Sequence, residues 1–425
     1  MKISAENKID KVGSWYSLKL RLVLILSVIG PGIITGTADN DAGGITTYSV
    51  VGASFGFKMM WVLFIIAFIL AITQEMGARL GLVTGRGLAA LIRENFSLKI
   101  TTFVVLITFL ANWANIVADF AGIASVADIY GVPRYIAIPL AAILIWAIVR
   151  VGSFKSVQKI FLTSSVLFLS YVVAGIMAKP DWGAAMNGLV SPQIEWTTPF
   201  FFTAVAMIGT TVTAWGQFFV QSYYVDKGVL VEHLKYSRFD IFAGSFWTII
   251  VAFFIVVATS STLFISGISI QDAGQAAMAL EPFAGVFAKH LFAWGLLNAS
   301  LLGLAVVAMT SSYLVTEAFG WEGRVNLKKE SPAFYRLFAL GVFSAALAML
   351  IPGLPLVQII VGSQMLNTFV LPILFIAILK LLNNEKLMGE YKNSKLMNFI
   401  SWTSVIFLVL MSSILLLMTF LSSGL

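Results

Sequence analysis

The chain has 425 residues, of which 59% are hydrophobic and 11% are charged, and its mean hydropathy is +0.93. Soluble domains average roughly 45–50% apolar and about 25% charged residues, so this composition excludes a soluble globular protein. Apolar runs of roughly 20 residues recur along the chain, the length that crosses a hydrocarbon core of about 30 Å. The chain contains no cysteine, which excludes disulfides and thiolate metal sites. The composition predicts an all-α polytopic membrane protein.

The apolar segments predict eleven membrane spans joined by ordinary loops, after an N-terminal arm at 1–21 that we interpret as cytoplasmic and uncleaved. The expected spans are 22–54, 57–85, 100–129, 133–150, 158–178, 198–225, 239–266, 285–316, 333–351, 354–382 and 397–421. If the N-terminus is inside, all but four of the 27 Lys and Arg residues lie on the inner side, the exceptions being Lys58, Arg134, Lys179 and Lys289. This asymmetry supports the span count and predicts that the C-terminus lies outside. We expect a multi-pass protein of a bacterial-type inner (plasma) membrane. The asymmetry also explains the excess of basic residues without a nucleic-acid partner.

Two of the expected spans are interrupted by polar or glycine-containing segments. The first contains Asp39-Asn40-Asp41-Ala42-Gly43-Gly44 at membrane depth, and the sixth contains Gly209 to Gly216 around three threonines. Spans one and six are five helices apart, as in a five-helix unit repeated with inverted topology, and paired broken helices are the best sequence indication of a transport site. We expect repeats at 22–178 and 198–382, with an eleventh helix at 397–421. For the sixth span, ordinary helix packing through Gly and Thr stays an alternative.

Few of the 20 acidic residues lie at membrane depth, where a charge costs roughly 2.5–3.5 kcal/mol and is normally functional. Asp39 and Asp41 fall on non-helical backbone, where carboxylates and freed carbonyls can face one cavity. These two residues therefore predict a cation site.

Glu75 and Asp119 each allow two interpretations. Glu75 lies four residues before Arg79, so it either forms an intrahelical ion pair or takes part in function. Asp119 follows Asn112 by seven residues and Asn115 by four, which gives one polar stripe on a helix. That stripe either lines a water-filled vestibule or packs against another polar helix.

Three motifs stand out in the first two spans. Gly30-Pro31-Gly32 opens the first span, Asp41-Ala42-Gly43-Gly44 lies at its break, and the second span contains Gln74 and the run from Ala78 to Gly85. These motifs resemble the Nramp family of divalent metal transporters, which carries Asp-Pro-Gly-Asn at the first-span break and a second-span signature that Gln74 and the run from Ala78 to Gly85 match. The resemblance implies a LeuT-like inverted-repeat fold in which spans one and six hold a divalent metal ion between them.

The chain also departs from that family pattern. Where the family's sixth span has Met-Pro-His, this chain reads Thr213-Ala214-Trp215 or, shifted by one, Ala214-Trp215-Gly216. The soft thioether ligand is therefore missing, and oxygen donors suit Mg²⁺, which keeps several of its waters. The two sixth-span histidines associated with proton movement are absent, and Gly122 replaces an acid. This pattern is most similar to the Nramp-related magnesium transporter branch, which implies uptake of hydrated Mg²⁺, with Mn²⁺ tolerated, by alternating access without proton coupling.

The expected metal ligands are Asp41 first and Asp39 second. The further candidate contacts to the metal are Asn40, Gly44, Thr210, Thr211, Thr213, Ala214, Gln364 and Asn367. A vestibule or proton path is assigned to Asp119, Asn112, Glu75 and Arg79. We expect no catalytic activity and no cofactor; the expected partners are the transported divalent ion and the lipid bilayer, and the sequence does not indicate an oligomeric state.

Three other functions fit parts of this pattern. The first is a proton-coupled Mn²⁺/Fe²⁺ transporter of the same fold, which would need Asp119 or Glu75 to carry protons. The second is a sodium-coupled transporter of organic solutes, because that fold is shared. A membrane enzyme or a channel is disfavoured by the lack of a nucleophile motif and by the two matched helix breaks.

Overall fold

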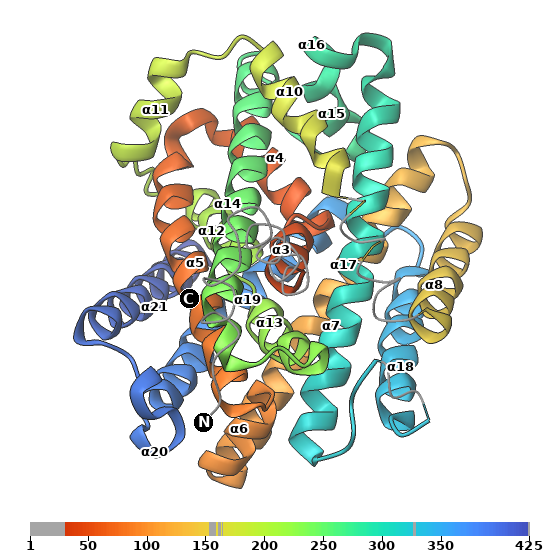
Figure 1. The fold of residues 1–425 in the computed structure, drawn as a ribbon. Coiled ribbons are helices and arrows are strands. Elements are labelled where there is room, and N and C mark those ends of the chain that lie inside the picture. The colour runs from red at the N-terminus through yellow and green to blue at the C-terminus, as the bar shows by residue number, and fades with distance from the viewer. Residues whose placement is uncertain (1–29, 153–158, 160–162, 164, 326–328, 424–425) are drawn as a thin grey trace, which may run out of the picture.

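The computed structural model describes residues 30–152, 159, 163, 165–325 and 329–423, and within that part of the chain the secondary structure is entirely helical (Figure 1). The predicted arm at 1–21 lies outside the described residues. So do the beginning of the first expected span, at 22–29, and residues 158, 160–162 and 164 of the fifth.

The helices follow one another with short connections. They are α3 (Pro31–Ala38), α4 (Ala42–Phe55), α5 (Met60–Thr84), α6 (Leu88–Asn95), α7 (Leu98–Ile129), α8 (Arg134–Val151), α10 (Leu169–Met177), α11 (Trp182–Val190), α12 (Thr198–Thr211), α13 (Ala214–Lys227), α14 (Leu234–Thr259), α15 (Ala273–Ala277), α16 (Glu281–Ala284), α17 (Ala288–Phe319), α18 (Pro332–Met349), α19 (Leu356–Leu382), α20 (Glu385–Met388) and α21 (Lys395–Ser423). Short 3₁₀ and π-helical turns join some of them, such as the π-helical turn Ser260–Phe264 after α14.

Nine helical segments among the described residues are long and apolar enough to cross a membrane. Each lies within or close to an expected span, and one of them, Ala42–Thr84, joins the second half of the first span to the second span. The structure describes only part of the first and fifth expected spans. The number of eleven spans therefore stays a prediction. The loops expected at 179–197, 267–284 and 383–396 differ from the prediction, because they contain the short helices α11, α15, α16 and α20.

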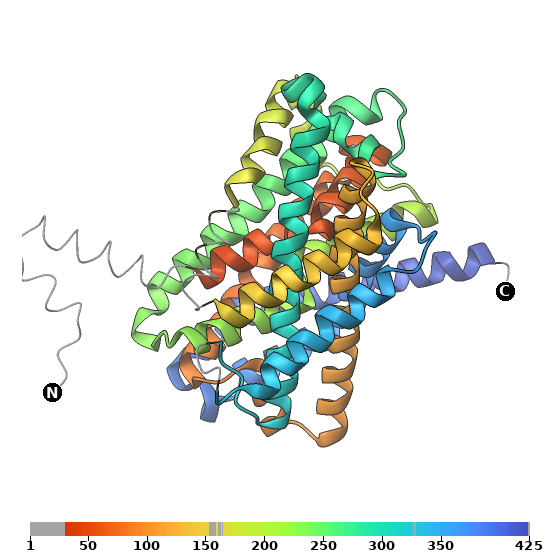
Figure 2. The same ribbon diagram turned by 90° about the vertical axis from the view of Figure 1, so that its right-hand side faces the viewer.

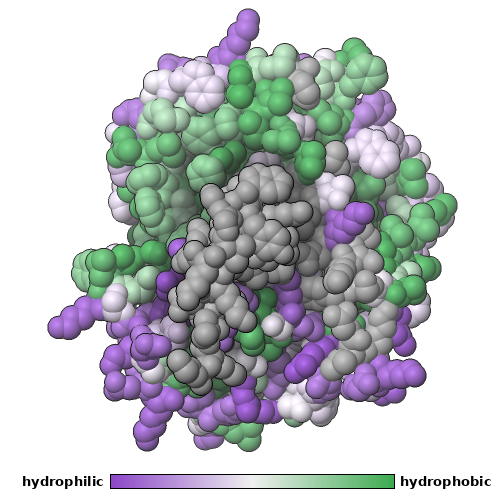
Figure 3. All heavy atoms as spheres, viewed as in Figure 1, coloured by the Kyte–Doolittle hydropathy of each residue, from purple (hydrophilic) through white to green (hydrophobic). Residues whose placement is uncertain are grey.

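The outer helices expose large apolar side chains, as expected for contact with lipid rather than water. On α14 the exposed residues Phe239, Phe242 and Phe246 recur at helical spacing, and α21 exposes Ile406, Leu410 and Leu417 in the same way. Hydrophobic residues cover much of the upper part of the face in Figure 3, and hydrophilic residues gather at its lower edge, over α6 and α20. α21 lies at the periphery in both ribbon views (Figure 2).

The broken helices lie at the centre of the molecule. The segment Thr198–Lys227 contains α12 and α13, and 89% of the residues in its most apolar stretch of 18 are buried. The corresponding shares are 28% for α8 and 33% for α21. α3 packs on α14 and α13, while α4 packs on α12, α14 and α19. α7 packs on both α17 and α19. The fold therefore encloses the two breaks between these helices.

Candidate functional site

Both helix breaks are stabilised by side chains of the break itself. α3 ends at Ala38, and α4 begins after Asp41, whose Oδ1 accepts a hydrogen bond from the Gly44 N–H at 3.0 Å. α12 ends at Thr211, and α13 begins after Thr213, whose Oγ1 accepts from the Gly216 N–H at 3.0 Å. Each second half-helix thus has the side-chain N-cap that a helix beginning inside a protein requires.

Asp39 connects the first break to two other helices. Its Oδ1 accepts a hydrogen bond from Thr213 Oγ1 at 3.1 Å, and its Oδ2 accepts from Gln74 Nε2 of α5 at 3.2 Å. The side chain is buried, with 1% of Asp39 exposed. The structure therefore brings Asp39 and Thr213 together across the two breaks, although 174 residues separate them in the sequence.

Asp41 faces α17 and α19 on the other side of the first break. Gly303 of α17 has no side chain, and Asp41 and Asp119 fill the space beside it. Any larger residue at 303 would place its Cβ 2.6 Å from Asp41 Cβ and 2.7 Å from both carboxylate oxygens of Asp119. A Cβ on Gly43 would lie 2.9 Å from Asp41 Oδ1 and would overlap the Gln364 amide of α19. Asp41, Asp119 and Gln364 therefore converge where these glycines leave space.

Asp119 has no hydrogen-bond partner at either carboxylate oxygen among the described residues. It is 0% exposed, and no ion pair is formed by Asp39, Asp41 or Asp119 within that part of the chain. Removing a carboxylate from water is costly unless a cation or hydrogen-bond donors compensate it. The three buried carboxylates therefore form an environment that favours a cation.

A chain of amides extends the site along α7 and α19. Asn367 Nδ2 donates to Gln364 Oε1 at 3.3 Å, and Asn367 and Asn115 exchange two hydrogen bonds of 3.2 Å. Gln364 Nε2 donates to Ser363 Oγ at 3.0 Å. The polar stripe of α7 thus packs in part against polar residues of α19, one of the two interpretations that the sequence left open.

The remaining predicted contacts differ in where their polar atoms point. Asn40 donates to Gly36 O at 3.5 Å, and its Oδ1 has no partner among the described residues. Thr211 Oγ1 donates to Met207 O at 2.7 Å and contacts the Tyr48 hydroxyl at 2.9 Å. Thr210 Oγ1 and both amide atoms of Asn112 are buried without a partner in the described part of the chain, and Ala214, the first residue of α13, is buried.

Glu75 and Arg79 belong to a different cluster. Arg79 Nε lies 3.1 Å from Glu75 Oε1, and Arg238 Nε of α14 lies 2.9 Å from the same oxygen. Arg79 also donates to Tyr391 O at 2.6 Å and to Asn393 Oδ1 at 2.7 Å. Glu75 and Arg79 therefore form the intrahelical ion pair that was one of the two interpretations of the sequence, because the i, i+4 spacing brings the two side chains together. Their assignment to a vestibule or proton path stays a prediction.

Sequence reasoning missed two residues near the breaks. Gln74 was noted as part of a second-span signature but not as a neighbour of Asp39, and Tyr48 was not considered. A polar residue in an apolar span was the available signal for Gln74. For Tyr48, whose hydroxyl meets Thr211 of α12, the sequence offered no signal because the partner is 163 residues away.

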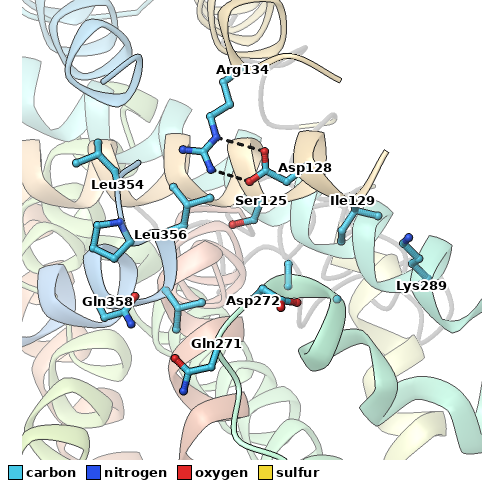
Figure 4. Close-up of a pocket in the computed structure, with 14 residues that line it drawn as sticks. Ser125, Asp128, Ile129, Arg134, Gln271, Asp272, Lys289, Leu354, Leu356 and Gln358 are labelled. Atoms are coloured by element: carbon cyan, nitrogen blue, oxygen red, sulfur yellow. Dashed lines mark hydrogen bonds and ion pairs between the residues drawn. The ribbon is translucent and has the colours of Figure 1, made fainter. Parts of the chain in front are cut away.

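Two cavities lie on opposite sides of the site along α7 and α17. One, of about 500 Å³, lies at the end of α7 and the beginning of α17, between Ser125, Asp272 and Gln358. Figure 4 shows two of its lining residues, Arg134 and Asp128, which form an ion pair at 2.7 Å. The other, of about 280 Å³, lies near the end of α17. Its lining includes Ser222 and Glu317, and Ser222 Oγ donates a hydrogen bond of 2.5 Å to Glu317 Oε1. Ser125 is six residues from Asp119 along α7, and Gln358 is six residues from Gln364 along α19. Six residues correspond to roughly 9 Å along a helix. The buried site therefore lies between the two cavities.

The donor atoms around the breaks are oxygens of carboxylates, amides and hydroxyls. Neither break contains Met, Cys or His. In the part of the chain that the structure describes, no three His, Cys, Asp or Glu side chains form a group that could hold a metal ion on their own. A cation here would be held by two carboxylates together with amide, hydroxyl or water oxygens, a donor set that suits a hard ion.

Residues 32–418 match the family described as natural resistance-associated macrophage protein-like, or Nramp. The chain belongs to the Nramp family. It is 25% identical over 412 residues to the divalent metal cation transporter MntH of Caldanaerobacter subterraneus subsp. tengcongensis, covering 95% of both chains. It is 26% identical to MntH of Burkholderia ambifaria, covering 91% of this chain and 88% of that one.

Solved structures share the fold of this Nramp protein. A manganese transporter of Eremococcus coleocola, crystallised with an aromatic bis-isothiourea compound, superposes with a TM-score of 0.73 at 18% identity, covering 95% of this chain and 87% of that one. Mhp1, a nucleobase-cation-symport-1 family transporter, gives a TM-score of 0.59 at 14% identity, covering 92% and 91%. These similarities confirm the all-helical, LeuT-like transporter fold. The division into two five-helix repeats and an eleventh helix stays a prediction.

Proposed function

We propose that this Nramp protein carries a divalent metal cation across the membrane by alternating access, with the ion bound between the α3–α4 and α12–α13 breaks. The observation that carries this proposal is the position of Asp39 and Asp41, two buried carboxylates on broken backbone. They lie next to a third carboxylate, Asp119, and form no ion pair within the described residues. Asp41 is proposed as the first ligand and Asp39 as a second ligand, direct or through water.

The names of the relatives favour manganese over magnesium as the cargo. The curated relatives are called divalent metal cation transporters and a solved relative is called a manganese transporter. The comparisons therefore support the proton-coupled Mn²⁺/Fe²⁺ alternative better than the magnesium branch. We take Mn²⁺ as the first cargo to test. Carboxylate and water ligands are suitable for Mn²⁺ as well as for Mg²⁺.

Hydrated Mg²⁺ is a second candidate cargo because the site offers no sulfur. Oxygen donors discriminate weakly between Mn²⁺ and Mg²⁺, whereas a thioether would favour the softer metal. Uptake of Mn²⁺ into proteoliposomes, measured with and without a large excess of Mg²⁺ outside, tests this. Strong inhibition by Mg²⁺, together with Mg²⁺ uptake in a direct assay, supports the second candidate, whereas Mn²⁺ uptake that Mg²⁺ does not affect rejects it.

Coupling to protons is decided by a separate measurement. The buried Asp119 carboxylate beside Asp41 supports the coupled alternative, and the absence of histidine from both breaks supports uncoupled transport. Vesicles that contain a pH-sensitive dye should acidify in proportion to metal uptake if the transport is coupled. Metal uptake without acidification, and with the same result in Asp119→Asn, supports the uncoupled proposal.

The proposed topology places the N-terminus in the cytoplasm and the protein in a plasma membrane of bacterial type, on the strength of the Lys and Arg distribution. Because the natural chain has no cysteine, single-cysteine variants report sidedness directly. Lys289→Cys should react with a membrane-impermeant maleimide added outside intact cells, and Lys386→Cys should react after permeabilisation. The reverse pattern would invert the proposed orientation.

A further inference from the structure

A carboxylate of α14 holds the beginning of α3. Asp240 Oδ1 accepts hydrogen bonds from the Gly30 and Ile33 N–H groups at 3.1 and 3.2 Å, and its Oδ2 accepts from the Gly32 N–H at 2.8 Å. The Tyr224 hydroxyl of α13 donates to the same Oδ2 at 2.8 Å. The first N–H groups of a helix lack partners within the helix, and Gly30 has no side chain to supply one. Asp240 supplies that cap from a distant part of the sequence.

Below this cap, α3 and α14 pack with their backbones in contact. A Cβ on Gly32 would lie 2.7 Å from the carbonyl atoms of Asp240, and Gly36 and Gly244 meet in the same way one turn further along. Thr248 Oγ1 then donates to Gly36 O at 2.6 Å. Gly32 and Gly36 are four residues apart, as are Asp240, Gly244 and Thr248. The contact is therefore a continuous row along one face of each helix.

The other end of α3 leads directly to Asp39 and Asp41. α3 has eight residues and is therefore roughly 12 Å long, so a displacement of its beginning moves the break as well. Its dipole favours an anion at the N-terminus, where Asp240 lies, and a cation at the C-terminus, where the break begins. Asp240 and a bound cation would stabilise the same half-helix from opposite ends.

We propose that Asp240 is a positioning residue that fastens α3 to α14, so that the two helices move as one unit and Asp39 stays opposite Thr213. The inference rests on the proposed metal site between α3–α4 and α12–α13. Without this attachment, α3 spends part of its time away from α14. The apparent affinity for metal then falls in proportion to the docked fraction, so the KM for metal rises about tenfold if that fraction falls to about a tenth.

The test uses Asp240→Asn, Tyr224→Phe and Thr248→Val in two assays. In the first, a single cysteine at half-buried Ile33 is alkylated without metal, and we expect faster labelling in all three variants than in the parent. In the second, Mn²⁺ uptake should show a raised KM with Vmax close to that of the parent, because saturating metal restores the docked state. A loss of folded protein alone would lower Vmax and leave KM unchanged.

Matched controls remove the same chemical groups at sites away from α3. Tyr335→Phe removes a buried hydroxyl that donates to Val325 O at 2.6 Å. Thr262→Val removes a half-buried hydroxyl that donates to Ala258 O at 2.7 Å. Both controls should behave like the parent protein. Unchanged labelling at residue 33 in folded Asp240→Asn, or in Tyr224→Phe and Thr248→Val if Asp240→Asn does not fold, overturns the proposal. If the parent binds no Mn²⁺, the proposed function fails while the labelling assay still decides the role of Asp240.

Discussion

Asp39 and Asp41 are two residues apart but make different contacts. The carboxylate of Asp39 is hydrogen-bonded to Thr213 and Gln74, so it joins three helices. Asp41 uses one oxygen to cap α4 and faces Asp119 and Gln364 with the rest of its side chain. Asp41 is therefore the better placed of the two to bind a metal ion without losing a hydrogen bond between helices.

Replacing Asp41 by Asn should remove the metal-dependent stabilisation while leaving the metal-free protein folded. An amide still caps α4 through its oxygen, and one uncompensated buried carboxylate disappears. The parent protein should gain about 2.7 kcal/mol at a Mn²⁺ concentration of about 100 times Kd. Thermal unfolding in detergent with increasing Mn²⁺ measures this gain. A metal-dependent rise in Tm that persists in Asp41→Asn would contradict the assignment of Asp41 as a ligand.

Thr213 combines a helix cap with a contact to the site, so its replacement by Val should affect both stability and metal affinity. We expect a loss of about 1 kcal/mol from the cap of α13 and a raised KM for metal, because Asp39 loses a hydrogen-bond donor. Thr197→Val is the matched control, since Thr197 caps α12 by accepting from the Phe200 N–H at 3.4 Å, away from the site. Urea unfolding and uptake kinetics measure the two effects. A KM that changes equally in both variants would reject the contact with Asp39.

Between helices, the network of Glu75, Arg79 and Arg238 connects α5 to α14 and to the segment before α21. Glu75 and Arg79 are 4% and 5% exposed at their side chains, whereas Arg238 is 47% exposed. The guanidinium of Arg79 uses its planar set of donors to reach Glu75, Tyr391 and Asn393 together. The network therefore joins α5 to its neighbouring helices through contacts that do not include Asp39 or Asp41.

Glu75→Gln should destabilise the protein by about 3 kcal/mol or more, because it leaves the buried Arg79 guanidinium without its carboxylate. The stoichiometry of any proton movement should stay unchanged in the folded fraction. Glu385→Gln, which breaks the exposed ion pair with Lys392, should change stability by less than about 1 kcal/mol. Chemical denaturation and the dye assay measure the two quantities. A changed proton stoichiometry with unchanged stability would instead support a place for Glu75 in a proton path.

The whole molecule places its buried site between two cavities. The cavity near Ser125 and Arg134 and the cavity near Ser222 and Glu317 lie at opposite ends of α17, and neither includes Asp39 or Asp41. Neither of these two cavities reaches the carboxylates of Asp39 and Asp41, which are both buried. Alternating access requires one of these cavities at a time to extend to the carboxylates.

A divalent ion carried alone should respond to the membrane potential. Each charge contributes about 2.3 kcal/mol per 100 mV, so a divalent ion gains about 4.6 kcal/mol from an interior-negative potential of about 100 mV. Proteoliposomes with a valinomycin-induced potassium diffusion potential should therefore take up Mn²⁺ faster and accumulate it to a higher level. Accumulation that follows an imposed pH gradient and ignores the potential would instead support proton coupling.

The sequence by itself determined the features that depend on local chemistry. Apolar runs predicted the spans, because length and hydropathy decide what crosses a bilayer. Polar and glycine residues at 39–44 and 209–216 predicted where two helices break, and the structure places the breaks at Asp39–Asp41 and Val212–Thr213. The motifs around Asp41 and Gln74 were sufficient to indicate the Nramp family, which the comparisons confirm.

Only the tertiary structure decided which side chains meet. It pairs Asp39 with Thr213, joins Asn115 to Asn367, and places Asp240 at the beginning of α3, a contact across 210 residues for Gly30. It also pairs Glu75 with two arginines, Arg79 and Arg238, of which the sequence predicted only Arg79. The physical reason is that a helix break is set by neighbouring residues, whereas a hydrogen bond between helices depends on how the whole bundle packs, and no local pattern encodes that distance.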